Sequence, residues 1–177
     1  MTGPATRAPG LGRRLACFVY EGVLLFGVVM ITGLVYAGIT QQRNALVGKS
    51  GLQVTLFIVL GIYFVGFWTR VGQTLPMQIW RIRLVTRDGG PVPPARACAR
   101  YLLSWLWFLP ALAAVHFSGL ENAAATFAAM AVGVVVYAAL TRLHPERQYL
   151  HDVACGTRLV DLPPRAPEPA ATAQPDA

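Results

Sequence analysis

Charged residues are scarce in this chain: they make up 13% of its 177 residues, whereas a soluble domain carries about 25%. Hydrophobic residues reach 55%, and the mean hydropathy is +0.49. So little charge beside so much apolar surface excludes an ordinary soluble domain and indicates a chain whose solvent is lipid. The length suits one domain.

Cysteine is scarce too, with Cys17, Cys98 and Cys155 widely spaced and no Cys-x-x-Cys pair. An odd set at such spacing excludes a disulfide framework. A metal site formed by cysteines and His151 stays open, but small buried or interfacial thiols are the simpler interpretation. We therefore expect no metal ion and no other cofactor.

The chain also lacks a basic, aromatic-rich soluble unit, although its formal net charge is +7. Its arginines flank apolar runs instead. This placement indicates membrane topology and contact with anionic lipid headgroups rather than nucleic-acid binding. We expect the lipid bilayer to be the main partner and nucleic acid not to be one.

Four apolar runs predict an all-α membrane protein with four transmembrane helices, because a helix of about 20 residues crosses the ~30 Å hydrocarbon core. The runs cover residues 15–39, 52–68, 101–117 and 123–140. They lie in one predicted membrane domain, residues 13–162. The ends, residues 1–12 and 163–177, are rich in Pro with Gly or Ala and are predicted to be disordered.

Single residues add detail to these runs. Tyr63 and Trp68, near the end of the second run, fit an interfacial aromatic belt. Pro110 is expected to kink the third run. In the fourth, Ala125, Ala129 and Gly133 recur every four residues and predict a small-residue face for close helix contact.

The distribution of Lys and Arg predicts the orientation. Of the fifteen, three precede the first run, six lie between the second and third runs, and four follow the fourth. The first link holds the other two. Basic residues favour the cytoplasmic side, so we expect both termini and the long link to be cytoplasmic.

The long cytoplasmic link is patterned. Apolar residues and arginines alternate over Ile79–Val85, which predicts a strand. Turn residues follow at Asp88–Pro91, and Pro93 or Pro94 then begins a helix that carries Arg96 and Arg100.

A second short strand is predicted near the C-terminal end, at Thr157–Val160, just after His151 and Asp152. An isolated strand leaves its backbone groups unpaired. We therefore expect the two strands to pair in a short cytoplasmic β-hairpin-like element, which would bring His151 and Asp152 beside the link.

Glu21 is the only charged residue inside the first run. An acidic side chain near mid-bilayer costs roughly 2.5–3.5 kcal/mol, so we expect a partner from another segment, with Arg96, Arg100 or Ser104 as candidates. Arg14 lies two turns away on nearly the same helix face. Glu21 is then either a structural polar lock or a transport or proton-handling site.

Asp152, at the membrane surface, is expected to accept from Arg13 or Arg14. His151 and Asp152 alone do not predict an enzyme, because they lack a nucleophile or a metal set and the aspartate can simply orient backbone groups.

Three segments together resemble the RDD family of small bacterial membrane proteins. They are Arg13–Glu21, Gly72–Gly90 and Leu150–Thr157. By position, Arg14 is the family's arginine, Glu21 replaces its first aspartate, and Asp152 is its second. Pro76 stands where relatives usually have glycine.

The resemblance implies a multi-pass protein of the bacterial cytoplasmic membrane and, most often, transport. We expect a small transporter or ion- or proton-coupled carrier, acting as a homo-oligomer because four spans make a thin pathway. The alternative is a non-transporting scaffold or accessory subunit whose cytoplasmic hairpin binds a partner. Neither is an enzyme, and the substrate is not identified.

Overall fold

The protein is mostly helical, with one small sheet. The computed structural model describes residues 8–41, 49–119, 122–143 and 145–163. Four helical stretches are long and apolar enough to cross a membrane, which confirms the predicted four spans. They cover Leu11–Thr40, Ser50–Ile79, Pro94–Ser118 and Ala123–Leu140. The predicted disorder of the ends falls mostly on residues 1–7 and 164–177, which lie outside the described residues.

Helix α1 (Leu11–Thr40) begins four residues before the apolar run and buries one narrow face. Its buried residues are Arg14, Cys17 and Glu21, spaced by three and four positions as one side of a helix requires. Elsewhere its large apolar side chains point outward: Phe26 is 68% exposed and Leu34 is 76% exposed. Such surface is costly in water and suits lipid.

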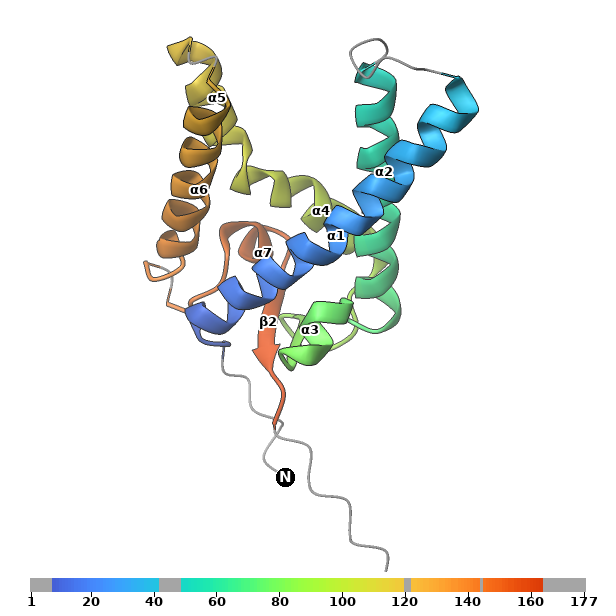
Figure 1. Ribbon diagram of the computed structural model, residues 1–177. Coiled ribbons are helices and arrows are strands. Elements are labelled where there is room, and N and C mark those ends of the chain that lie inside the picture. Colours follow the sequence, from blue (N-terminus) through green and yellow to red (C-terminus); the bar gives the residue numbers. More distant parts are fainter. Residues whose placement is uncertain (1–7, 42–48, 120–121, 144, 164–177) are drawn as a thin grey trace, which may run out of the picture.

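The third span is broken rather than kinked. Helix α4 (Pro94–Ser104) ends in a 3-10 turn, η1 (Trp105–Trp107), before α5 (Leu109–Ser118) begins. Pro110 lies in the first turn of α5, where a missing N–H costs nothing, so the expected kink at Pro110 is replaced by a break at η1. In Figure 1, α4 runs across the molecule while α5 turns away from it.

Helix α6 (Ala123–Leu140) packs along α5. A Cβ atom built on Gly133 would lie 2.8 Å from the Cβ atom of Ala111, so only glycine allows this approach. The small-residue face predicted in the fourth run therefore serves contact within the chain at this point.

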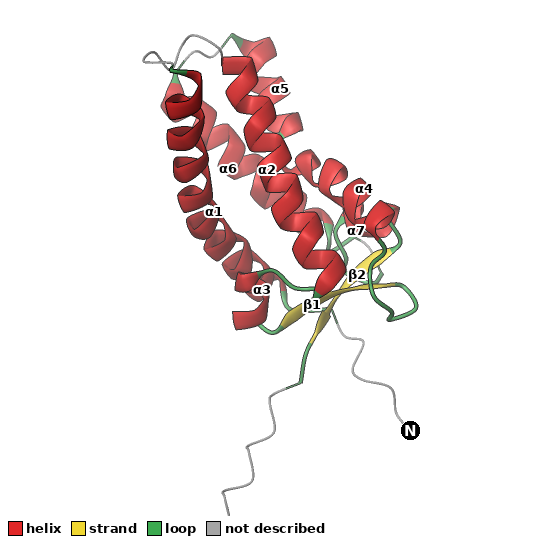
Figure 2. Ribbon diagram, turned by 90° about the vertical axis from the view of Figure 1, so that its right-hand side faces the viewer, coloured by secondary structure: helices red, strands yellow, loops and turns green. Residues whose placement is uncertain are grey.

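The spans form two pairs that diverge. Helix α1 crosses α2 (Lys49–Arg70), and α5 lies beside α6. Figure 1 shows the pairs separating toward one end, and α4 with η1 connecting them at the other. We call the connected end the sheet end, because the two-stranded sheet lies there, below the helices in Figure 2.

The sheet pairs segments far apart in the sequence, as predicted. Strand β1 (Ile82–Thr86) lies antiparallel to β2 (Thr157–Asp161), with Leu84 opposite Leu159. The first strand starts three residues later than expected, because helix α3 (Leu75–Ile79) occupies the preceding residues. Pro76 fits there: it lies in the first turn of α3.

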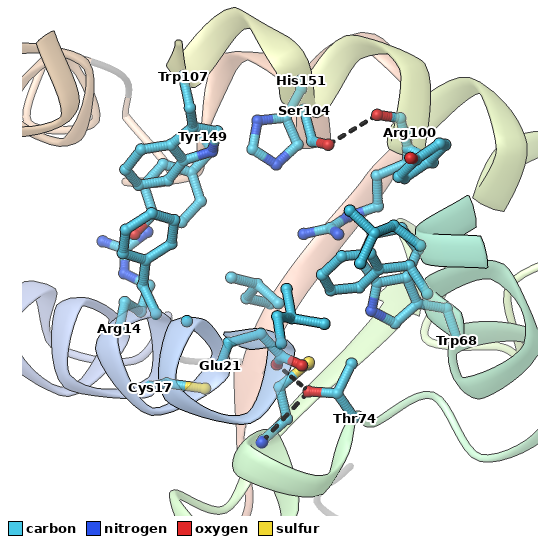
Figure 3. A pocket seen from close by; sticks show the side chains of 18 of the residues that line it. Arg14, Cys17, Glu21, Trp68, Thr74, Arg100, Ser104, Trp107, Tyr149 and His151 are labelled. Atoms are coloured by element: carbon cyan, nitrogen blue, oxygen red, sulfur yellow. Dashed lines mark hydrogen bonds between the residues drawn. The ribbon is translucent and has the colours of Figure 1, made fainter. Parts of the chain in front are cut away.

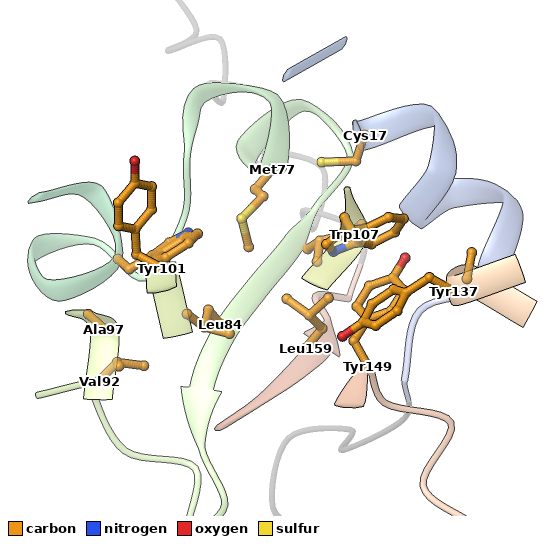
Figure 4. Close-up of a cluster of buried hydrophobic side chains, with 13 residues drawn as sticks. Cys17, Met77, Leu84, Val92, Ala97, Tyr101, Trp107, Tyr137, Tyr149 and Leu159 are labelled. Carbon is orange, nitrogen blue, oxygen red and sulfur yellow. The ribbon is translucent and has the colours of Figure 1, made fainter. Parts of the chain in front are cut away.

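The hydrophobic core sits on this sheet. Leu84 is 1% exposed and packs with Leu159, Trp107, Tyr137 and Tyr149 in one cluster, drawn in Figure 4. Rings from the broken third span and from α6 thereby meet the strand residues.

Gly72 joins the sheet end to the second span. Its carbonyl accepts from the backbone N–H of Leu84 at 2.8 Å, and its φ is +75°. A Cβ atom there would lie 2.9 Å from the Leu84 carbonyl oxygen, so glycine is required on both counts. Near the C-terminal end of the described chain, helix α7 (Leu150–Ala154) leads into β2.

Candidate functional site

A cavity of about 270 Å³ opens between the helices just above the sheet. Its charged lining residues are Arg14, Glu21 and Arg100; in Figure 3 the first two project from α1 and Arg100 from α4 on the opposite side. Aromatic rings supply much of the remaining wall. The aromatic residues are Phe18, Phe64, Trp68, Tyr101, Trp105, Trp107, Phe108 and Tyr149.

Glu21 is held by two hydroxyl groups. Tyr63 Oη donates to its Oε1 at 2.7 Å, and Thr74 Oγ1 donates to its Oε2 at 2.5 Å. Thr74 also caps α3, since its oxygen accepts from the Met77 N–H and its own proton is left for the carboxylate. Both carboxylate oxygens are therefore acceptors, the arrangement that suits an ionised glutamate.

The structure thus gives Glu21 other partners than the sequence suggested. Ser104 donates to the Tyr101 carbonyl, and Arg96 is exposed with its guanidinium 3.4 Å from the Gly156 carbonyl oxygen. Arg100 lines the same cavity but pairs with another carboxylate. Among the described residues no cation lies within ion-pair distance of Glu21.

Arg100 and Asp152 form a buried ion pair. Arg100 Nε donates to Asp152 Oδ1 at 2.6 Å, and the guanidinium lies 4.2 Å from the centre of the Trp68 ring. Burial by itself would raise the pKa of Asp152, but the charges of Arg100 and His151 and a hydrogen bond from Thr157 outweigh burial, so the pKa lies below its ordinary value. Asp152 is therefore a carboxylate behind the cavity wall.

The two N-terminal arginines contact other groups than Asp152, the acceptor expected for them. Arg13 forms an ion pair with Asp161 at 2.6 Å, at the end of β2. Arg14 Nη1 donates to the Arg147 carbonyl at 2.8 Å. The Arg14 guanidinium also lies 4.8 Å from the centre of the Tyr149 ring.

His151, in the cavity wall, lies beside two aromatic rings. Its ring is nearly parallel to those of Tyr137 and Tyr149, at 6.0 and 5.5 Å between centroids. Tyr137 Oη accepts from the His151 backbone N–H and forms a second hydrogen bond with Nδ1 at 2.9 Å. Burial lowers the pKa of His151 from 6.5 to about 4, against the opposing effect of Asp152. The imidazole is therefore neutral at pH 7.

The family model of the RDD family matches residues 8–156, which is most of the chain and includes Arg14, Glu21 and Asp152. The chain belongs to the RDD family. No curated protein and no solved structure gives a significant match.

The RDD segments converge on the cavity. The first segment supplies Arg14 and Glu21, and the second supplies Thr74, which binds Glu21. The third supplies His151, in the cavity wall, and Asp152, which holds Arg100. The predicted set of Arg14, Glu21 and Asp152 therefore gathers at one site, although no two of the three pair directly in the structure.

Several site residues were not found from the sequence. Tyr63 and Trp68 fitted an interfacial belt, but Tyr63 binds Glu21 and Trp68 is 4% exposed beneath Arg100. Nothing in the sequence around Tyr137 and Tyr149 indicated that their rings contact the site. Thr74 could have been found, because a threonine before a proline-containing first turn is a typical helix cap.

The cysteines do not build a metal site in the described part of the chain, where no three of the side chains His, Cys, Asp and Glu gather. Cys17 and Cys155 are buried free thiols, and Cys98 is an exposed one.

Proposed function

We propose that this RDD protein is a small ion- or proton-coupled carrier in which Glu21 is the coupling group. The observation that carries the proposal is that Glu21 is buried inside a membrane span and faces a cavity. Among the described residues, its only side-chain hydrogen-bond partners are two hydroxyl groups. Ionisable groups in membrane segments usually face such cavities and mark transport or proton pathways.

The architecture supports this use of Glu21. The third span breaks at η1, and its break residues Trp105 and Trp107 line the cavity. Irregular backbone at membrane depth is tolerated where it is buried in protein or lines a cavity, and discontinuous helices form binding sites in many carriers. Four spans make a thin pathway, so we expect a homo-oligomer.

Proton-linked flux in liposomes that contain only the purified protein tests the proposal. A trapped pH-sensitive dye reports proton movement when sodium, potassium and amino acids are added in turn. Glu21→Gln keeps the shape and most acceptors but cannot exchange a proton, so it should fold and lose at least about 90% of the flux. Glu21→Asp restores the family's usual residue and should retain flux. A folded Glu21→Gln protein with unchanged proton-coupled flux would remove the coupling role.

The alternative, a non-transporting scaffold or accessory subunit, rests on a different surface. Arginines are exposed around the sheet end, at Arg70, Arg83, Arg87 and Arg96. They suit anionic headgroups or an acidic partner, each Lys or Arg near an anionic surface contributing about 1 kcal/mol. A protein that shows no flux but binds a partner through these arginines would favour the scaffold. Neither function is enzymatic.

The proposed location is the bacterial cytoplasmic membrane, with the sheet end in the cytoplasm. The distribution of Lys and Arg in the sequence is the support for this orientation.

A further inference from the structure

We propose that the cavity binds a small zwitterion with an apolar frame, such as an apolar amino acid. The inference names a substrate class for the proposed carrier. It depends on the proposed function only where it concerns transport, because binding can be measured separately.

The charges of the site leave one cation and one anion unmatched. Arg100 is matched by Asp152, at 2.6 Å. In the part of the chain that the structure describes, Arg14 lies within ion-pair distance of no carboxylate, and Glu21 within that distance of no cation. A ligand with one carboxylate and one ammonium group would match both and leave the site neutral.

Arg14 is placed to bind the carboxylate of the ligand. The residue is 5% exposed, its Nη1 donates to a backbone carbonyl, and its Nε has no hydrogen-bond partner. A guanidinium has five donors in a fixed fork that matches a carboxylate. A buried charge with unused donors is destabilising until an acceptor arrives.

Glu21 is placed to accept the ammonium group. It is 8% exposed and lines the cavity, and its two hydrogen bonds come from neutral hydroxyl groups of Tyr63 and Thr74. A carboxylate offers about four lone-pair sites, so two remain for a cationic ligand.

The opposite charges of the two groups favour one zwitterion over one simple ion. Arg14 and Glu21 lie seven residues apart on the buried face of α1, so their backbone positions are ~10 Å apart along the axis. A simple ion carries charge of one sign and would match only one of them. The cavity is also lined by rings such as Phe18 and Phe108, which favour an apolar frame on the ligand.

Three matched probes test the proposal on the wild-type protein in lipid nanodiscs. They are L-leucine, 4-methylpentanoate (the same molecule without the amine) and 3-methylbutylamine (without the carboxylate). Binding is followed by intrinsic fluorescence, since Trp68, Trp105 and Trp107 line the cavity. Leucine should bind at least about ten-fold more tightly than either analogue, as expected when a charge-assisted hydrogen bond is lost.

Substitutions at Arg14 and Glu21 test which residue binds which charged group of the ligand. In Arg14→Gln the affinity for leucine should fall to that for 3-methylbutylamine. In Glu21→Gln it should fall to that for 4-methylpentanoate. Arg142→Gln, at an exposed arginine outside the cavity lining, should bind leucine as the wild type does.

Equal affinity for leucine and either analogue would overturn the proposal, as would no binding of L-valine, L-leucine and L-phenylalanine. These outcomes need no variant, so they decide even if a substitution prevents folding. Binding of leucine without flux would contradict the carrier function and leave the zwitterion site standing. Proton-coupled flux of sodium or potassium without leucine binding would do the reverse.

Discussion

At the scale of single residues, the low pKa of the buried His151 predicts that the stability of the fold depends on pH. His151 is neutral in the fold because burial lowers its pKa from 6.5 to about 4. Between those pH values the unfolded chain binds a proton that the folded chain does not, so stability falls as the pH decreases from about 6.5 to about 4. The difference corresponds to about 3 kcal/mol of the free energy of unfolding. Thermal unfolding in detergent at stepped pH should show this loss.

The control for this prediction is His151→Gln, which cannot take up the proton. Its melting temperature should be lower at pH 7, because the stacked ring is lost, but it should change less between pH 6.5 and pH 4. Asp152 does not confuse the comparison, since its pKa lies below 3.8 and its protonation belongs to lower pH. A variant with the full acid sensitivity of the wild type would show that another group is responsible.

The positions of Arg14 and Glu21 could be predicted from the sequence, but their partners could not. Helical periodicity alone places residues 14 and 21 on one face. Which side chain meets Glu21 depends on how α2 and α3 cross α1, and a hydroxyl such as that of Tyr63 gives no charge signal. Arg100 was a candidate partner for Glu21 because the sequence does not show that Arg100 forms an ion pair with Asp152.

At the scale of secondary-structure elements, the strand register predicts a cross-link. Arg83 lies opposite Val160 in the β1–β2 pair, where Cβ atoms are about 4.5–5.5 Å apart. Cysteines at positions 83 and 160, in a background without the three native cysteines, should form a disulfide in high yield under mild oxidation. The pair 83 and 161 is the control, since a one-residue shift turns the second side chain to the other face. Equal yields would contradict the register.

The close contact between α5 and α6 predicts the effect of a substitution at Gly133. Gly133→Ala places a methyl group 2.8 Å from the Cβ atom of Ala111 and should separate α5 from α6, at a cost of about 1–3 kcal/mol. Gly27→Ala, on the exposed face of α1 with nothing within 4 Å, should not destabilise the protein. Unfolding midpoints of both variants in the same detergent measure the difference.

Elements with a strong local signal were predicted well, and the break in the third span was not. The strands followed from alternation and the helix start at Pro94 from proline chemistry. Residues 101–117 form a continuous apolar run, and Pro110 drew attention to the wrong point. The break occurs at Trp107 because its ring packs on Phe18, Tyr137 and Tyr149, contacts that depend on the assembled fold.

At the scale of the whole molecule, the number of spans and the direction in which the protein faces are separate questions. The structure puts the start of α1, the β1–β2 sheet and the end of α6 toward one end, which agrees with four spans and with both ends of the described chain on one side. The side of the membrane that this end faces is a prediction from the distribution of charge. Thirteen of fifteen basic residues belong to that end in the sequence-based topology.

Reporter fusions test this orientation directly. Fusions after Gly48 and Glu121 should be active as periplasmic alkaline phosphatase and inactive as a cytoplasmic reporter, because both positions lie between spans at the end with little basic charge. Fusions after Asp88 and Asp161 should behave in the opposite way. The Asp88 position decides most, since it lies among the six basic residues of the long link, whose transfer across the membrane is strongly disfavoured. An external Asp88 would reverse the orientation, and with it the side from which a ligand enters the Glu21 cavity.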